Sequence, residues 1–192
     1  VIAVRDFSGA GPMIIKSNQN VLLIDQRGHG KSKGKTITFG IKESQDVICW
    51  SNYLINRFGK DCVLFLYGVS MGASTALLAS LRDDLPHNVK KVLVDCPFSS
   101  CRKILLDFAK KSHIPSWVCY FLAAPSALIF GHFNFFKGDI LKEIKNIHLP
   151  TLIIHGTDDT VVPCYMSEKI ASLNKNFIQL EIFTNADHAM SF

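Results

Sequence analysis

Continuous apolar runs, each only a few residues long and rich in β-branched side chains, recur along the chain. Strands that are buried on both faces of a parallel sheet have this pattern, because helices cover each side and leave no polar face. We therefore predict parallel strands at Val1–Val4, Val21–Ile24, Val63–Tyr67, Val89–Val94, Thr151–Ile154 and Ile178–Phe183.

Segments of helical length separate several of these runs. The segment from Phe39 to Phe58 carries apolar residues at helical spacing, and the segment from Met71 to Leu81 is rich in Ala and Leu. This alternation of strands and helices predicts an α/β fold with a mostly parallel, doubly wound sheet. The chain has 192 residues, the length of one domain, so we treat residues 1–192 as a single domain.

The segment 98–149 interrupts the alternation, since it is about twice as long as a usual crossover connection. We interpret it as a helical cap inserted into the domain. Within it, Ile114–Phe136 contains no Asp, Glu, Lys or Arg and is long enough for a membrane span. Pro115, Pro125 and several polar residues in this stretch favour short helices that close over an apolar pocket, because such residues in lipid need satisfied partners. Contact with a membrane is the alternative.

The composition argues against several classes of protein. Apolar residues make up 48% of the chain and charged residues 19%, which is ordinary for a globular fold and argues against disorder, collagen and repeat arrays. The net charge is +5, but the basic residues are scattered rather than gathered on one face with aromatic residues between them. We therefore expect no nucleic-acid partner.

The six cysteines fall at irregular intervals, mostly inside apolar runs, and form neither a CxxC pair nor a zinc-binding pattern with histidine. We expect free, buried thiols in a reducing compartment. No charged region or signal peptide precedes the apolar run that begins at Val1. These observations predict a cytoplasmic protein without a metal or organic cofactor, with peripheral membrane association as the alternative.

A serine flanked by glycines lies where a predicted strand meets a predicted helix: Gly68-Val69-Ser70-Met71-Gly72 has the pattern GxSxG. A tight turn from strand to helix exposes a serine hydroxyl as a nucleophile, and glycine at its flanks lets backbone pass close to backbone. We expect Ser70 to be the nucleophile. The N–H of Met71, at the positive end of the helix, is expected to stabilise an oxyanion.

A nucleophilic serine needs a base, and in this arrangement an acid and a histidine follow it in chain order, on loops after later strands. The last predicted strand is followed by Asn185-Ala186-Asp187-His188, so we expect His188 to be the general base. The strand before it is followed by His155-Gly156-Thr157-Asp158-Asp159, which supplies two candidate acids. Asp95, after an earlier strand, is a third candidate.

Four motifs together resemble the α/β-hydrolase superfamily, and within it the esterase and acyl-peptidase branch. They are Asp25-Gln26-Arg27-Gly28-His29-Gly30-Lys31-Ser32, the GxSxG pattern, the HGTxDxxVP pattern that begins at His155, and the final Ala-Asp-His-Ala-Met-Ser-Phe. The resemblance extends from about Val21 to Phe192. It implies that Asp159, three residues after the Gly of HGTxD, is the acid, with Asp158 as its neighbour in the loop and Asp95 as a cap of the following turn.

The stretch Arg27–Ser32 contains the letters GHGKS, which superficially suggest phosphate binding. A phosphate-binding loop needs Gly five positions before Gly30, and Asp25 stands there. The resemblance implies a structural turn after the strand, with Asp25 and Arg27 as polar anchors.

Two departures from the superfamily pattern concern the ends of the chain. Relatives usually carry His-Gly where this chain has Arg5-Asp6, and the next residue supplies the second N–H of the oxyanion hole. The register assigns this role to Phe7, with Gly9 as the alternative. Relatives also have strands before Val1 and a helix after His188, so we expect the chain to be a fragment with one sheet face open.

The resemblance implies hydrolysis of an ester, thioester or related acyl bond through an acyl-serine intermediate on Ser70. The apolar stretch within residues 98–149 favours a small-molecule substrate with a hydrophobic acyl chain. A serine peptidase or amidase of the same fold is the nearest alternative. A non-catalytic binding or scaffold protein and a membrane-associated acyl-binding module are the others, and the oligomeric state stays open.

Overall fold

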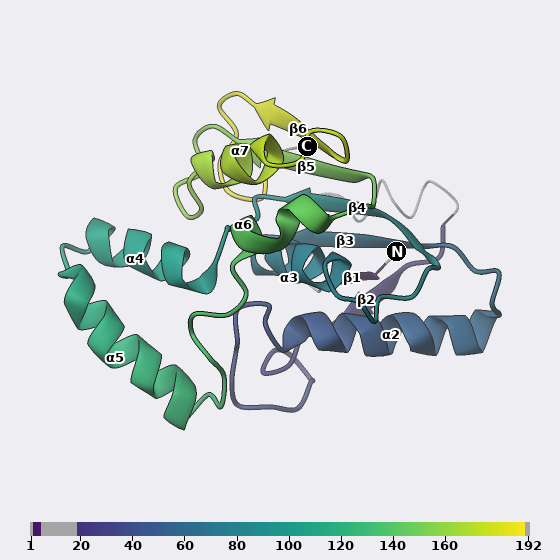
Figure 1. Cartoon of the computed structure of the whole chain (residues 1–192), viewed down its shortest axis with the longest axis horizontal. Coiled ribbons are helices and arrows are strands. Elements are labelled where there is room, and N and C mark those ends of the chain that lie inside the picture. The colour runs from purple at the N-terminus through teal and green to yellow at the C-terminus, as the bar shows by residue number, and fades with distance from the viewer. Residues whose placement is uncertain (1, 5–18, 191–192) are drawn as a thin grey trace.

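The computed structural model describes residues 2–4 and 19–190, and in this part of the chain six strands form one parallel sheet. The strand order is β2-β1-β3-β4-β5-β6 (Figure 1). The strands are β1 Ile2–Val4, β2 Leu22–Ile24, β3 Leu64–Val69, β4 Val89–Asp95, β5 Thr151–Gly156 and β6 Ile178–Phe183. Every neighbouring pair is parallel, which confirms the predicted fold class.

The described helices follow the predicted alternation with the strands. They are α2 Glu43–Phe58, α3 Met71–Ser80, α4 Cys101–Lys111, α5 Ser116–Ile129, α6 Ile140–Glu143, the 3₁₀ helix η1 Ile144–Asn146 and α7 Tyr165–Ser172. The helix predicted from Phe39 begins four residues later, at Glu43, because Phe39 and Gly40 have φ values of +54° and +93° that a right-handed helix excludes. The buried Glu43 carboxylate accepts hydrogen bonds from the N–H groups of Thr38 and Gly40, which fixes this entry turn.

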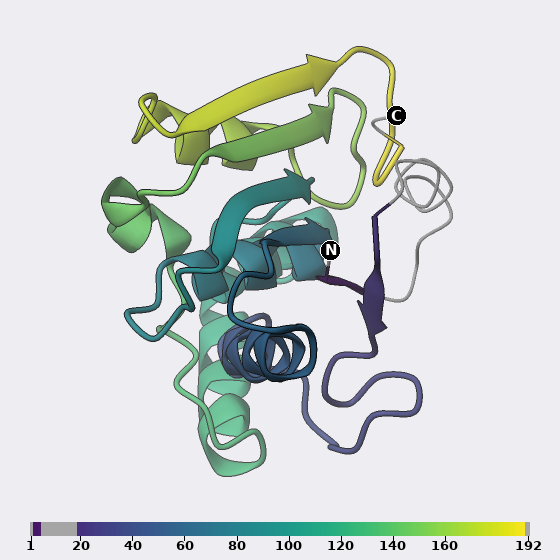
Figure 2. The ribbon, with the colours of Figure 1, turned by 90° about the vertical axis from the view of Figure 1, so that its right-hand side faces the viewer.

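The main core lies between the sheet and one layer of helices (Figure 2). Residues of α2, α3, α6 and α7 pack in one cluster with alternate strand residues such as Leu66, Val92 and Ile153. Exposure on the opposite face is mixed: Leu23 is 49% exposed and Phe65 is partly exposed, whereas Tyr67 and Ile154 are buried. Among the described residues, the expected open face of the sheet is therefore only partly open.

The order of the strands marks where a site can form. The chain passes from β1 outward to β2 and then returns across the sheet to β3, β4, β5 and β6. In open α/β sheets, ligands bind beyond the carboxyl ends of the strands, near the point where the strand order reverses. Here that point lies between β1 and β3, next to the turn that carries Ser70.

The long segment between β4 and β5 divides into two parts. The helices α4 and α5 form a hairpin that projects from the body of the molecule (Figure 1). The helix α6 and the helix η1 belong to the main core, where Ile140, Ile144 and Ile147 are fully buried. Among the described helices, none is long and apolar enough to cross a membrane. That residues 98–149 act as a cap over substrate stays a prediction.

The cysteines are free, but their burial differs from the expectation. Only Cys96 and Cys101 are buried, whereas Cys49 is exposed on α2 and the other three are intermediate. Apolar neighbours in the sequence therefore did not decide burial, because a helix turns one side of such a run to solvent.

Gly68 allows the start of α3 to pass against the end of β3. A Cβ atom at Gly68 would lie 2.2 Å from the carbonyl oxygen of Gly72. We expect Gly68→Ala to lower the free energy of unfolding by about 3 kcal/mol, because the backbone must move apart. Urea denaturation measures this loss as a lower midpoint concentration of urea, with an unchanged slope of unfolding free energy against urea concentration.

Gly59→Ala is the matched control, since a Cβ atom there meets nothing within 4 Å. It adds the same methyl group without a steric clash and carries only the conformational cost of its backbone (φ +98°, ψ +163°), about 1–3 kcal/mol. A loss below about 1 kcal/mol in Gly68→Ala would contradict the steric role of Gly68.

Candidate active site

Ser70 lies in a strained turn between β3 and α3, at the carboxyl edge of the sheet. Its backbone has φ +54° and ψ −117°, values that residues other than glycine rarely adopt. The Ser70 N–H donates to the carbonyl oxygen of Asp95 at 2.9 Å, and the N–H of Ser74 donates to the Ser70 carbonyl at 3.1 Å. These bonds hold the turn that the GxSxG pattern predicts, with Met71 as the first residue of α3.

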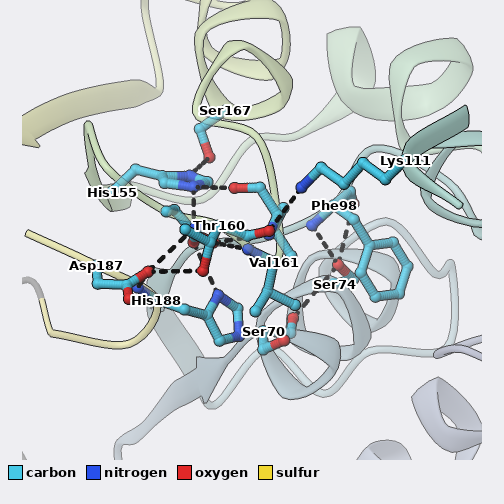
Figure 3. Close-up of polar contacts among 12 residues, drawn as sticks. Ser70, Ser74, Phe98, Lys111, His155, Thr160, Val161, Ser167, Asp187 and His188 are labelled. Carbon is cyan, nitrogen blue, oxygen red and sulfur yellow. Dashed lines mark hydrogen bonds and ion pairs between the residues drawn. The ribbon is translucent and has the colours of Figure 1, made fainter. Parts of the chain in front are cut away.

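The imidazole of His188 is hydrogen-bonded to the carboxylate of Asp159, with 2.8 Å between Nδ1 and Oδ2. A carboxylate oxygen only accepts, so Nδ1 carries the proton and Nε2 is left as an acceptor. In Figure 3 Ser70 is drawn beside the ring of His188, and no hydrogen bond joins the two side chains. The structure thus brings Ser70, His188 and Asp159 to one edge of the sheet from three separate loops.

The carboxylate of Asp159 is fully buried and accepts hydrogen bonds on both oxygens. Oδ1 accepts from the backbone N–H groups of Val161 at 2.8 Å and Val162 at 2.7 Å. Oδ2 faces His188 and also Nε2 of His155, at 3.2 Å. A buried charge needs such partners, and this one has them in its own loop, in β5 and in the loop after β6.

The environment of Asp159 shifts its pKa in two opposed ways. Burial by itself raises the pKa, because it disfavours the charged form. Hydrogen bonds from His155, His188 and the two backbone N–H groups favour the carboxylate and outweigh burial, so the pKa of Asp159 lies well below its ordinary value. Asp159 is therefore a fixed negative charge at neutral pH, suited to stabilise an imidazolium at His188.

His155, the last but one residue of β5, connects this carboxylate to α7. Its Nε2 lies 2.9 Å from the carbonyl oxygen of Val162 and 3.2 Å from Oδ2 of Asp159. Both of these atoms only accept, so Nε2 carries a proton. Nδ1 lies 2.7 Å from the hydroxyl of Ser167, which can donate to it. The fully buried ring therefore orients Asp159 from the side opposite His188.

Further bonds join the loop of Asp159 to the loop of His188. Asp187 accepts from the N–H of His188 at 2.7 Å and from the N–H of Thr160 at 3.1 Å, and these bonds lower the pKa of Asp187. The N–H of Asp158 donates to the carbonyl oxygen of Ala186 at 3.0 Å. A Cβ atom at Gly156 would lie 2.1 Å from that same oxygen. The glycine of the HGTxD pattern is thus required for the two loops to meet.

Cys96 lies at the centre of the site, directly after β4. Its sulfur, a ligand atom of Asp159 and a ring nitrogen of His188 lie within 4.8 Å of one another. Burial and the charge of Asp95 raise the pKa of the Cys96 thiol, and hydrogen bonds from the backbone of Ala189 and Ser70 partly oppose this. Contact with both backbones places Cys96 between the serine turn and the histidine loop.

The same cluster is the candidate cation site among the described residues. Both carboxylate oxygens of Asp159 are already occupied by the N–H groups of Val161 and Val162 and by two imidazole rings. His188 already uses Nδ1 on Asp159. The donor set therefore fits a hydrogen-bonded site better than a metal centre.

The structure distinguishes the three candidate acids by their contacts. Asp159 is the carboxylate that bonds His188, whereas the side chain of Asp158 is exposed and accepts from the hydroxyl of Thr157 at 2.8 Å. Asp95 is buried at the end of β4, and its backbone carbonyl receives the N–H of Ser70. The predicted second oxyanion donor Phe7, its alternative Gly9 and the pair Arg5-Asp6 lie outside the described residues.

The sequence analysis missed the roles of His155, Asp187 and Cys96. His155 and Asp187 both stand inside the motifs that were singled out, so their positions beside the acid and the histidine were a usable signal. Cys96 carried no such signal, because only the packing of β4 beside β3 and β5 brings it to the site.

The motif around Arg27 forms the predicted structural turn. The Asp25 carboxylate accepts a hydrogen bond from the N–H of Lys31 at 2.8 Å. The backbone carbonyl oxygen of Asp25 accepts one from the hydroxyl of Ser32 at 2.6 Å. The guanidinium of Arg27 binds both carboxylate oxygens of Asp46 on α2, at 2.7 and 2.5 Å. The two anchors thus fold the turn and fasten it to a helix.

An apolar cluster borders the site. Phe98, Ile104, Val162 and Met166 are buried against one another, and Phe39, Met71 and Tyr165 pack against them. Met71 follows Ser70 directly, and Val162 belongs to the loop of Asp159. A reacting group at Ser70 would therefore meet an apolar wall on one side and the polar cluster of His188 on the other.

A comparison with known families identifies the family to which the chain belongs. Residues 14–124 match the family described as Serine aminopeptidase, S33 (Hydrolase_4). This match covers more than half of the chain, so the chain belongs to this family of α/β hydrolases. The resemblance that the motifs suggested is thereby confirmed at the level of the superfamily.

Of two similar proteins, one is uncharacterized and the other is named as a lipase. YqkD, an uncharacterized protein of Bacillus subtilis, is 30% identical over 174 residues, which cover 90% of this chain and 57% of YqkD. The lysophosphatidylserine lipase ABHD12 of Danio rerio is 27% identical over 163 residues, which cover 80% of this chain and 39% of the lipase. The chain thus spans about half the length of these relatives or less.

Solved structures agree with the fold. The Pyrococcus furiosus esterase Pf2001 superimposes with a TM-score of 0.69 at 23% identity, over 98% of this chain and 74% of the esterase. An acylaminoacyl peptidase of Pyrococcus horikoshii gives a TM-score of 0.65 at 18% identity, over 88% of this chain and 28% of the peptidase. At these identities the likeness establishes the α/β-hydrolase fold alone.

The lowered pKa of Asp159 predicts how stability depends on pH. The folded protein holds the carboxylate charged more strongly than the unfolded chain does, so this stabilisation is complete above about pH 5 and is lost as pH falls through and below the unfolded value of 3.8. We expect Asp159→Asn to lower the free energy of unfolding by about 3 kcal/mol at pH 7, because the backbone donors and His155 lose a charged acceptor.

Urea denaturation at pH 7 and at pH 3 measures this difference. The variant should lose less stability than the wild type between these two values, because it lacks the group that titrates. Asp158→Asn, the exposed neighbouring carboxylate, is the control and should behave as the wild type. A pH dependence that is identical in wild type and Asp159→Asn would contradict the assignment.

Proposed function

We propose that this chain carries a serine hydrolase site that cleaves an ester, thioester or related acyl bond. Membership of the α/β-hydrolase family supports hydrolase activity in general. The observation that carries the finer proposal is the hydrogen bond between His188 and the buried, charged Asp159, at the sheet edge where the strained turn presents Ser70.

The proposed reaction begins with attack of the Ser70 hydroxyl oxygen on the substrate carbonyl carbon. Nε2 of His188 takes the hydroxyl proton, and Asp159 stabilises the imidazolium through Nδ1. The oxyanion forms near the N–H of Met71, which begins α3 and has no partner inside the helix. Collapse of the intermediate breaks the acyl bond, and the leaving group takes the proton from His188.

The second half of the reaction regenerates the enzyme. A water molecule gives its proton to Nε2 of His188 and attacks the acyl carbon of the acyl-Ser70 ester. Collapse releases the carboxylic acid and returns the proton to the Ser70 oxygen. Each step uses groups that this chain supplies, with water as the co-substrate.

An apolar acyl chain is the substrate feature that the site favours. Phe39, Met71 and Tyr165 pack on the buried cluster beside the loop of Asp159 and stay partly exposed, so burial of hydrocarbon against their exposed surface is favourable. The names of two relatives, a lysophosphatidylserine lipase and an esterase, are consistent with such a substrate.

Labelling with a fluorophosphonate probe tests the nucleophile. Such a probe reacts with a serine that an imidazole activates, so the wild type should be labelled and Ser70→Ala should not. Ser70→Ala should also lower kcat/KM for a p-nitrophenyl ester by about 10⁴-fold or more. Gel fluorescence and absorbance of p-nitrophenolate provide the two measurements.

Ser172→Ala, at the end of α7, is the matched control and should retain full labelling. A folded wild type that stays unlabelled would refute the enzyme and favour the scaffold alternative. Labelling that persists in Ser70→Ala would place the nucleophile at another residue.

A serine peptidase is the second candidate, because the family bears the description of serine aminopeptidase. The leaving group of an amide is poorer than that of an activated ester and depends more on protonation, so matched substrates can separate the two activities. We expect turnover of p-nitrophenyl esters, with kcat/KM rising as the acyl chain lengthens, and little turnover of aminoacyl anilides. Hydrolysis of the anilides alone would overturn the preference for esters.

A further inference from the structure

The helix α5 exposes a broad apolar face. The side chains of Trp117, Phe121 and Leu128 are 66%, 76% and 64% exposed, and they stand four and seven residues apart, on one side of the helix. Leu122 and Ile129 are also exposed and extend the same face. These residues belong to the segment predicted to form a cap, and in the structure their side chains are exposed.

The opposite side of α5 is fixed to the body of the molecule. Ala127 is buried in a cluster with Cys101, Phe133 and Phe135, and Tyr120 packs against this cluster. Lys111, at the end of α4, donates to the carbonyl oxygen of Thr160 and ties the hairpin to the loop of Asp159. The exposed face is therefore presented by a hairpin that is anchored on both of its helices.

An open apolar groove runs beside this face. It has a volume of about 600 Å³ and lies between α5 and the segment that follows it. Its lining includes Phe121, Pro125, Leu128 and Phe136, with Asn134 among the few polar residues. The groove opens on the same side as Phe121 and Leu128, so hydrocarbon that met the helix could also enter the groove.

The charged residues that flank α5 most closely in the sequence are all basic. Between Asp107 and Asp139 the chain contains no acidic residue, whereas Lys110, Lys111 and Lys137 flank the apolar helix. All three lysines are exposed. An apolar face with lysines at its rim and a tryptophan near one end matches a bilayer surface that carries negative headgroups.

The length of α5 decides how it would meet a bilayer. Its 14 residues extend about 21 Å, which is shorter than the hydrocarbon core of about 30 Å. The helix can therefore lie in the interface but not cross it. Phe121 and Leu128 would enter the acyl region while Lys110 and Lys137 meet the headgroups.

A second copy of the chain fits this face less well. Two α5 helices packed antiparallel about a twofold axis would bring Lys110 and Lys111 of one copy near Lys137 of the other. Juxtaposed like charges oppose association. Complementarity of charge thus favours an anionic lipid surface over self-association.

We propose that the exposed face of α5, flanked by Lys110 and Lys137, docks the protein on an anionic membrane surface. Docking would place the apolar side of the hairpin in lipid while Lys111 keeps it tied to the loop of Asp159. The inference rests on α5 and its flanking charges, and it stands independently of the reaction proposed for Ser70.

Co-sedimentation with vesicles tests the proposal. The protein should bind vesicles of phosphatidylcholine and phosphatidylserine, bind vesicles of phosphatidylcholine alone more weakly, and dissociate as salt is raised. In a Trp50→Phe background, Trp117 is the remaining tryptophan, and its fluorescence should shift to shorter wavelength on binding. Ser70→Ala should bind as the wild type does, which separates this test from that of the proposed reaction.

Two sets of variants locate the docking face. The double variant Phe121→Asp with Leu128→Asp should lower the partition coefficient about a hundredfold or more, because both side chains lose hydrocarbon burial. Lys110→Gln and Lys137→Gln should each lower it about fivefold on anionic vesicles. Phe58→Asp, on α2, is the matched control, because Phe58 is 60% exposed at a site away from the hairpin.

Two outcomes would overturn the proposal. One is a wild type that fails to bind anionic vesicles, or binds them equally well after the change at Phe121 and Leu128. The other is sedimentation velocity that shows a dimer which the same double variant dissociates, without vesicle binding by the wild type, since a second copy would then be the occupant. Circular dichroism of each variant verifies that the fold is retained.

Discussion

The buried carboxylate of Asp159 is the interaction on which the arrangement of the site depends. A charge with no exposed surface is tolerable only when donors surround it, and here the donors come from three places: the N–H groups of Val161 and Val162, the ring of His155 and the ring of His188. Each donor satisfied by Asp159 is also a constraint on the segment that carries it. The carboxylate therefore fixes the conformation of its own loop, holds the end of β5 in place and orients His188. Asp187 repeats this role on a smaller scale, because it joins the N–H of His188 to Thr160.

The strained turn at Ser70 and the polar cluster at Asp159 depend on each other through the sheet. Ser70 can hold an unfavourable backbone conformation because β3 and α3 are both fixed in the core, and because its N–H is bound to β4. The loops of Asp159 and His188 follow β5 and β6, which continue the same sheet in order. The parallel arrangement sends all of these loops to one edge. Cys96, directly after β4, lies between them, with its sulfur within 4.8 Å of a ligand atom of Asp159 and a ring nitrogen of His188.

The α4–α5 hairpin differs in character from the rest of the chain. Most apolar residues of the other helices lie in the core, whereas α5 buries Ala127 and turns Trp117, Phe121 and Leu128 outward. A hydrogen bond from Lys111 to the carbonyl oxygen of Thr160 connects this hairpin to the loop of the acid. The chemistry proposed for Ser70 and the surface proposed for lipid are thus adjacent in the fold, although each is supported by its own residues.

The sequence by itself determined the sheet and the position of the serine turn. These features follow from local patterns: β-branched runs form buried strands, and GxSxG between a strand and a helix predicts the tight turn, whose strained backbone the core then holds. The chain order also selected His188 and limited the acid to three carboxylates. The motif resemblance favoured Asp159 over Asp95 and Asp158, and the tertiary structure shows that the Asp159 carboxylate contacts His188. The position of Cys96 beside them came from the tertiary structure alone, since contact between segments far apart in sequence depends on strand register. The exposure of α5 was also decided by the tertiary structure, because a sequence shows that a helix is apolar but does not show which of its sides the fold covers.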